Sequence, residues 1–130
     1  MLNAVLIEIK TPETPLLGGL YRDDVYNVHG QLTGAVQQVL NSKHTFMEEF
    51  TNLKARSAAE FEGVNPPCLV IAGNTAQFSG EQRRVKSFEL YRNELKGVAV
   101  ITFDELFAKV HALVELLEKG VGSSSPGGTI

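Results

Sequence analysis

An acidic and a basic residue, Glu8 and Lys10, lie two positions apart in an otherwise apolar segment near the start of the sequence. Residues 4–10 are predicted to form a β-strand. Because successive side chains of a strand alternate between its two faces, Glu8 and Lys10 share one face. A carboxylate there can bind a hard divalent cation such as magnesium. The ammonium group can position or polarise an attacking water and offset charge on a phosphodiester. The pair is therefore a candidate site for metal-dependent hydrolysis of nucleic acid.

The same spacing also occurs by chance, as a surface salt pair on an edge strand. A third polar residue bears on this choice. Gln38 lies beside the apolar stripe of a helix predicted over residues 31–60, and it could reach the face of the strand that carries Glu8 and Lys10. The alternative for Gln38 is an exposed helical glutamine.

The whole chain is predicted to fold as one α/β domain over residues 1–120, followed by a disordered Gly- and Ser-rich tail at 121–130. The alternation of strands and helices favours a central mixed sheet flanked by helices. A helix is expected to begin at a capping box formed by Ser79 and Gln82 and to end before Gly97. The other expected elements are strands at 4–10, 68–72 and 98–101, a long loop at 11–30, and helices at 31–60 and from a Thr102–Glu105 capping box to Gly120.

Both long helices carry an apolar stripe at three- and four-residue steps, and we expect each stripe to be buried. The stripe of the first helix comprises Leu32, Val36, Val39, Leu40, Phe46, Met47, Phe50 and Leu53. The stripe of the last helix comprises Leu106, Phe107, Val110, Leu113, Val114 and Leu117.

The bulk composition excludes several classes of protein. The single cysteine, Cys68, excludes an internal disulfide and a thiol-based zinc site. No apolar run approaches the roughly 20 residues that span a bilayer, so we expect no membrane partner. We see no secretion signal and expect the protein to be cytoplasmic. The net charge of −3 gives no overall basic footprint, so any DNA-binding surface must be local.

Residues 6–12 resemble the catalytic strand of PD-(D/E)XK nucleases. Residues 30–41, 86–92 and 101–106 are similar to later blocks of the Shedu antiphage family, whose nuclease domain is of that type. The resemblance implies that Glu8 is a metal ligand for Mg²⁺ or Mn²⁺, that Lys10 is the catalytic lysine, and that Gln38 matches a helical glutamine of the family. In the family this glutamine is often followed four residues later by a tyrosine, where this chain has Ser42.

The resemblance also implies a restriction-endonuclease-like core that lacks its first helix and strands here. The family carries a metal-binding aspartate on the preceding strand, whereas only three residues precede Ala4, none of them acidic. The chain could be an excised piece, a truncated product, or one that borrows strands from a second copy. Glu13, Asp23 or Asp24 could substitute as a ligand. Because one carboxylate binds a divalent cation weakly, we expect little or no nuclease activity from this chain alone.

Two groups of residues are candidates for binding substrate. Tyr21 and Arg22 lie in the expected loop, and Arg83 and Lys86 share one face of a short helix. Arg84 and Arg92 of the same helix could also contact phosphates. The alternatives are a loop packed over the sheet edge and a solvated helix face.

The resulting functional hypothesis is a metal-dependent nuclease domain, acting on DNA, from a bacterial antiphage defence protein. The alternative is a non-catalytic interaction module in which Glu8 and Lys10 form a relic salt pair. A missing layer of the core would leave an unprotected strand edge, so we expect the chain to form a homo-oligomer.

Overall fold

The computed structural model describes residues 4–56 and 65–123, which form an α/β fold as predicted. The expected helical residues 57–60 lie outside the described residues, as do residues 124–130 of the tail expected at 121–130. The strands are β1 (Leu6–Ile9), β2 (Leu17–Arg22), β3 (Val25–Val28), β4 (Cys68–Ile71) and β5 (Val98–Ile101). The helices are α1 (Gly30–Arg56), the 3₁₀ turn η1 (Thr75–Phe78), α2 (Gln82–Asn93) and α3 (Phe103–Ser123).

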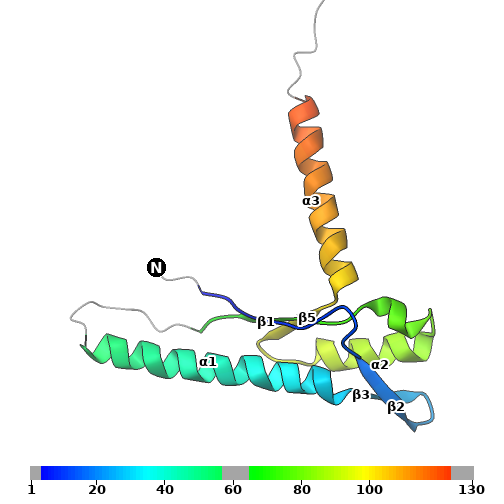
Figure 1. Cartoon of the computed structure of the whole chain (residues 1–130), viewed down its shortest axis with the longest axis horizontal. Coiled ribbons are helices and arrows are strands. Elements are labelled where there is room, and N and C mark those ends of the chain that lie inside the picture. The colour runs from blue at the N-terminus through cyan, green and yellow to red at the C-terminus, as the bar shows by residue number, and fades with distance from the viewer. Residues whose placement is uncertain (1–3, 57–64, 124–130) are drawn as a thin grey trace, which may run out of the picture.

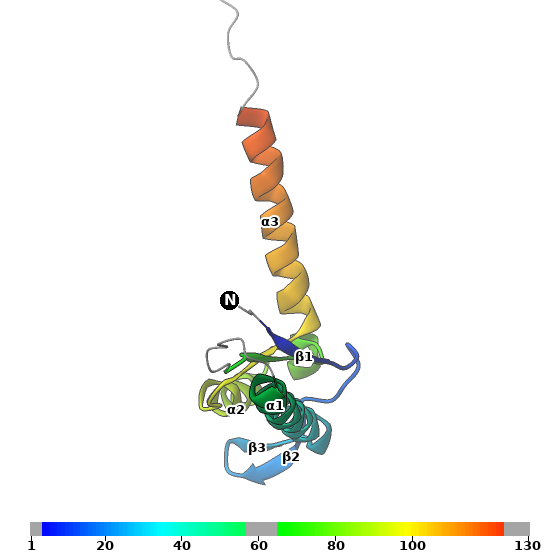
Figure 2. The same ribbon diagram turned by 90° about the vertical axis from the view of Figure 1, so that its left-hand side faces the viewer.

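The central sheet has three parallel strands in the order β1-β4-β5. Glu8 pairs in register with Val70, and Val70 pairs with Val100. Helices α1 and α2 cover one face of this sheet, while α3 rises from the opposite side (Figures 1 and 2). The antiparallel strands β2 and β3 form a separate two-stranded sheet, so the strands do not join into one mixed sheet.

The hydrophobic core lies between the parallel sheet and helices α1 and α2. Cys68 belongs to it, as expected for a residue that opens a buried strand. The buried members of the core are Leu16, Leu32, Ala35, Val36, Val39, Cys68, Val70, Ala72, Phe78, Phe88, Val98 and Val100. The core lies on one face of the sheet only. Glu8 is on that face, so its side chain points towards the helices.

The prediction of a loop over residues 11–30 is wrong for its second half, which forms the β2–β3 hairpin. Exposure alternates along β3, with Tyr26 and Val28 less exposed than Val25 and Asn27, which is the period of a strand. Asp23, at the tip, has a φ of +43°, a left-handed conformation that aspartate tolerates better than most residues. Two acidic residues at the tip thus make a tight turn rather than a loop.

A second prediction fails at the start of α2. Ser79 does not cap this helix but ends η1 in the left-handed conformation, with a φ of +49°. Glu81 is the N-cap of α2 and makes no side-chain capping hydrogen bond. The sequence pattern placed the cap two residues early because the short η1 turn intervenes.

The expected burial of both long apolar stripes is only partly correct. In α1 the first turns are buried. Leu40 is exposed next to buried Val39, and Met47 and Leu53 are exposed where the helix extends beyond the sheet that it covers. In α3 the stripe is exposed from Phe107 onward, and the helix continues past the expected end at Gly120 to Ser123. None of the helices in the described ranges is both long and apolar enough to cross a membrane.

Arg92 joins α2, β5 and α3. Its guanidinium donates hydrogen bonds to both oxygens of Glu105 at 2.7 and 2.8 Å, to Glu89, and to the backbone carbonyl of Val100 at 3.2 Å. It also lies over the Phe88 ring, 4.6 Å from its centroid. The guanidinium of Arg92 therefore serves contacts within the fold, in place of the suggested phosphate contact.

Glu105 holds the start of α3 in place. As the Thr102–Glu105 pair predicted, its carboxylate accepts a hydrogen bond from the backbone N–H of Thr102, at 3.0 Å. Hydrogen bonds from Arg92 lower the pKa of Glu105 from 4.5 to about 2, despite the opposing effect of burial.

We expect Glu105→Gln to lower the free energy of unfolding by about 2 kcal/mol at neutral pH, because Arg92 loses its charged partner. Since the folded-state pKa of Glu105 is lowered, the stabilisation is present above its usual pKa of 4.5 and is lost as pH falls towards about 2. Urea unfolding at several pH values checks this, with exposed Glu94→Gln as control. A deficit that does not shrink in acid would contradict the assignment.

Candidate functional site

Glu8, Lys10 and Gln38 converge on the helix-covered side of the sheet. Lys10 Nζ lies 3.1 Å from Glu8 Oε1 and donates a hydrogen bond to Gln38 Oε1 at 3.4 Å. The side chains of Glu8 and Lys10 are 18% and 34% exposed, so water and small ions reach both. The convergence that sequence spacing predicted is present.

The pairing of β1 with β4 orients this site. The backbone N–H groups of Leu6 and Lys10 donate to carbonyls of β4 and the residue before it. In a parallel pair such contacts recur at every second residue, so Ile7 and Ile9 turn their backbone groups towards the other edge of β1, where no strand of the described residues pairs. Their side chains lie on the opposite face, 50% and 63% exposed. The charged residues of β1 are thus covered in part while its isoleucines are not.

The rotation of α1 brings Gln38 to the same place. Leu32, Val36 and Val39 are almost fully buried against the sheet, which fixes the face of the helix that points inward. Gln38 precedes Val39 and so lies at the border of this face, exposed but within reach of Lys10. Packing of aliphatic residues therefore positions the glutamine.

The segment that follows Lys10 is anchored to the end of β4. Gly73 donates its N–H to the carbonyl of Thr11 and accepts from Phe103. Its φ is +69°, and a Cβ there would lie 2.6 Å from Leu16 and 2.8 Å from the Thr14 carbonyl. Any other residue at position 73 would therefore displace the segment around Thr14 and Leu16, which follows Lys10.

The described residues do not complete a metal site. Within them, no three His, Cys, Asp or Glu side chains gather as cation ligands. Glu8 supplies one carboxylate, and Lys10 lies against it. Of the suggested substitutes, Asp23 and Asp24 lie at the tip of the β2–β3 hairpin, where Asp24 Oδ2 is 3.6 Å from Lys86 Nζ. Glu8 is thus a single carboxylate ligand, whereas a divalent cation such as Mg²⁺ takes about six oxygen ligands.

The four expected substrate-binding residues lie around the hairpin and α2. Tyr21 and Arg22 are exposed on β2, and Arg83 and Lys86 are exposed on α2. Both views place the β2–β3 hairpin across α1 from β1 (Figures 1 and 2). The structure therefore brings these residues near one hairpin but does not bring them together with Glu8 and Lys10.

A polar network that the sequence did not suggest fastens the hairpin to α2. Tyr26 donates its hydroxyl to Glu81 at 2.9 Å, and its backbone N–H donates to the Ser87 hydroxyl. Arg84 donates to Glu81 at 2.8 Å and lies over the Tyr26 ring. The hydrogen bonds from Tyr26 and Arg84 lower the pKa of Glu81. Arg84 thus has a structural contact in place of the suggested phosphate contact.

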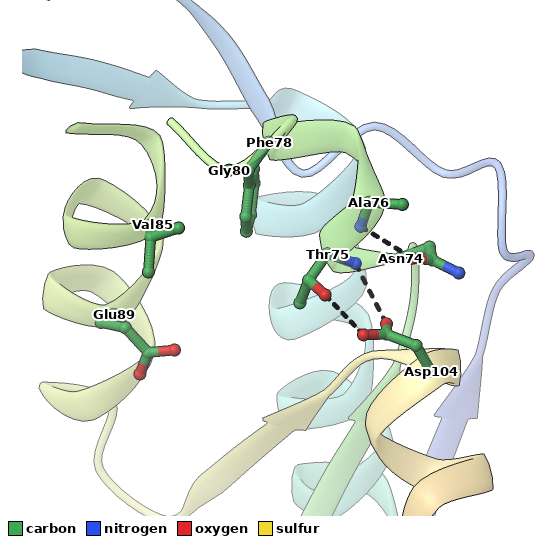
Figure 3. Close-up of a pocket in the computed structure, with 8 residues that line it drawn as sticks. All are labelled: Asn74, Thr75, Ala76, Phe78, Gly80, Val85, Glu89 and Asp104. Atoms are coloured by element: carbon green, nitrogen blue, oxygen red, sulfur yellow. Dashed lines mark hydrogen bonds between the residues drawn. The ribbon is translucent and has the colours of Figure 1, made fainter. Parts of the chain in front are cut away.

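A pocket of about 510 Å³ lies at the base of α3, and Glu8, Lys10 and Gln38 are not among the residues that line it (Figure 3). On one wall Asp104 accepts hydrogen bonds from the backbone N–H and the hydroxyl of Thr75. Burial favours a raised pKa for Asp104, but hydrogen bonds from Thr75, from Thr102 and from backbone N–H groups together lower the pKa. Val85 and Glu89 form the facing wall on α2. Asp104 lies in the first turn of the helix that the Thr102–Glu105 capping pair predicts, whereas nothing in the sequence analysis pointed to Thr75.

Known proteins are similar in sequence to this chain over most of its length. Residues 2–107 match the family described as "Shedu protein SduA, C-terminal". The chain is also 49% identical over 122 residues to the Shedu protein SduA of Bacillus cereus (strain B4264).

This chain belongs to the Shedu family. The aligned region covers 89% of the chain and 32% of the Bacillus relative, so the chain spans about a third of that protein's length. The glutamate, lysine and glutamine that converge at β1 all lie within the matched region of this Shedu chain.

We expect Glu8→Gln and Lys10→Met each to change the free energy of unfolding by less than about 1 kcal/mol, because partly exposed ion pairs contribute little to stability. Urea denaturation of the single and double variants measures both effects and their coupling. A loss of several kcal/mol would show that the pair serves the fold, as in the interaction-module hypothesis.

Proposed function

We propose that this Shedu chain is the C-terminal part of a PD-(D/E)XK-type nuclease domain that cleaves DNA in a bacterial antiphage defence protein of the cytoplasm. The observation that carries the proposal is the contact of Lys10 with both Glu8 and Gln38 on one partly exposed face. A carboxylate, an ammonium group and an amide at one place are the groups that phosphodiester hydrolysis uses.

Each residue has a distinct role in the proposal. Glu8 is one ligand of a divalent cation, Mg²⁺ or Mn²⁺, which when bound stabilises negative charge on the phosphate. Lys10 holds the attacking water or the phosphate oxygen with its ammonium group. Gln38 orients Lys10 through its side-chain oxygen.

The proposal requires further carboxylates beside Glu8, from outside the described residues. The unpaired edge of β1 is where they would enter, because an added strand lies about 4.8 Å away and its matching side chains point to the same face. Until that strand is supplied, Lys10 neutralises Glu8.

A non-catalytic interaction module is the second candidate function. It is supported by the large apolar side chains that β1 and α3 expose. In that case Glu8 and Lys10 would be a salt pair without substrate, and the apolar surfaces would carry the function.

A chimera tests the nuclease proposal. The part of the Bacillus relative that precedes the aligned region would be joined to this chain, and plasmid cleavage measured with Mg²⁺ or Mn²⁺. We expect cleavage by the chimera and little or none by the 130-residue chain. Glu8→Ala and Lys10→Ala should each lower the rate at least about 100-fold. Gln38→Ala, which removes only an orienting contact, should lower it about 10-fold.

Gln37→Ala is the matched control, because Gln37 is the exposed neighbour of Gln38 on the same helix. Full activity of a chimera that carries Glu8→Ala or Lys10→Ala would exclude the proposed roles. Robust cutting by the isolated chain, lost in these variants, would show that its own residues complete the metal site.

Arg83 and Lys86 provide a test of nucleic-acid binding. If they contact phosphates, Arg83→Gln and Lys86→Gln should weaken DNA binding by the chimera equally for all sequences, each reducing the slope of log affinity against log salt by about 1. Fluorescence anisotropy over a salt series measures this. Unchanged slopes would favour a solvated helix face, consistent with the contacts of Arg83 with Glu81 and of Lys86 with Asp24.

A further inference from the structure

The pocket at the base of α3 has a carboxylate on each of two facing walls and apolar side chains between them. Glu89 lies on the wall formed by α2, Asp104 lies at the start of α3, and the Phe78 ring lies between the two walls (Figure 3). Val85 and Ala76 add further apolar surface to the lining. The pocket volume of about 510 Å³ is within the range of about 300–1,000 Å³ that is typical of small-molecule sites.

Both carboxylates are held in place by contacts within the fold. Thr75 donates its backbone N–H and its hydroxyl to Asp104. Arg92 donates two hydrogen bonds to Glu89, one to each carboxylate oxygen. A ligand that contacts these carboxylates therefore does not have to order them first, which lowers the entropic cost of binding.

The charges around the pocket are not balanced. Arg92 is paired with Glu89, but it is also paired with Glu105. Its one positive charge therefore stands against three negative charges when Asp104 is counted, which leaves a net charge of −2 on these four groups. Among the described residues that line the pocket, none is Lys, Arg or His. This excess favours a positively charged ligand over a neutral or an anionic one.

The arrangement suits an organic cation better than a metal ion. Mg²⁺ takes about six oxygen ligands around one point. The two carboxylates of the pocket instead lie on opposite sides of an apolar space, and no group of three His, Cys, Asp or Glu side chains forms within the described ranges. A linear molecule with a cationic group at each end and methylenes between them matches both the charged walls and the apolar surface.

We propose that this pocket binds a linear aliphatic diamine, with one ammonium group at Asp104, the other at Glu89, and the methylene chain against Phe78 and Val85. Alkyl amines of this kind carry their charge at neutral pH, as the side chain of lysine does. The proposal is independent of the nuclease function, because the residues of the candidate site do not line the pocket.

Titration of the ¹⁵N-labelled chain with putrescine, followed by amide chemical shifts, tests the site. We expect saturable shifts at Thr75, Val85 and Asp104. n-Butylamine has the same carbon chain with a single ammonium group, and it should bind about 10-fold more weakly because one charge-assisted hydrogen bond is lost. 1-Butanol, which has no charge, should bind more weakly still.

Glu89→Gln and Asp104→Asn each remove one negative charge with little change of shape, and each should weaken putrescine binding about 10-fold. Glu94→Gln removes the same charge from the exposed end of α2, outside the pocket lining, and should leave the affinity unchanged. Ala76→Leu keeps both carboxylates but fills part of the pocket, and it should also weaken binding. The amide spectrum shows whether each variant is folded, so Ala76→Leu decides the test if a charge variant is not.

Three results would overturn the proposal. The first is the absence of saturable shifts at millimolar putrescine. The second is binding of 1-butanol as tight as that of putrescine, because the pocket would then select apolar surface alone. The third is an equal loss of affinity in Glu94→Gln and Glu89→Gln, because putrescine would then follow the overall negative charge of the chain and not the pocket.

Discussion

The pairing of β1 with β4 determines which side chains of β1 face the helices, and the candidate site depends on it. A shift of one residue in that register would turn Glu8 and Lys10 to the uncovered face and bring Ile7 and Ile9 against α1. The register is held by the backbone hydrogen bonds of β1 and by the anchoring of the following segment at Gly73. The chemistry of the site is therefore a consequence of strand alternation.

The two edge strands of the parallel sheet, β1 and β5, differ in what contacts their outward backbone groups. At the β5 edge the carbonyl of Val100 is bonded by Arg92, which blocks that edge with a charged side chain. Along β1 the outward backbone groups of Ile7 and Ile9 form the other edge, next to their exposed side chains. Among the described residues, the β5 edge is thus blocked by Arg92, whereas the β1 edge, next to Glu8, pairs with no strand. Further protein that pairs with β1 would enter next to the site.

Local periodicity was sufficient to predict the core of the site. Glu8 and Lys10 follow from the two-residue period of a strand, and Gln38 follows from the stripe of a helix. The hairpin was missed because Gly18, Gly19 and the acidic pair at its tip resemble loop residues. The alternating exposure along β3 is seen only in the folded chain. The exposure of α3 could not be predicted, since an apolar stripe indicates that a helix face needs cover but not which surface provides it. The roles of Arg92 and Glu105 depend on contacts between elements, which spacing alone does not give.

Nuclear Overhauser contacts from the Lys10 side chain test the placement of the site most directly. The structure predicts contacts between the Lys10 ε-methylene and the Gln38 side chain, and none between Lys10 and residues on the uncovered face of the sheet, such as Ala99. Contacts from Lys10 to that face, with Ile7 or Ile9 found against α1, would contradict the account and separate Glu8 and Lys10 from Gln38.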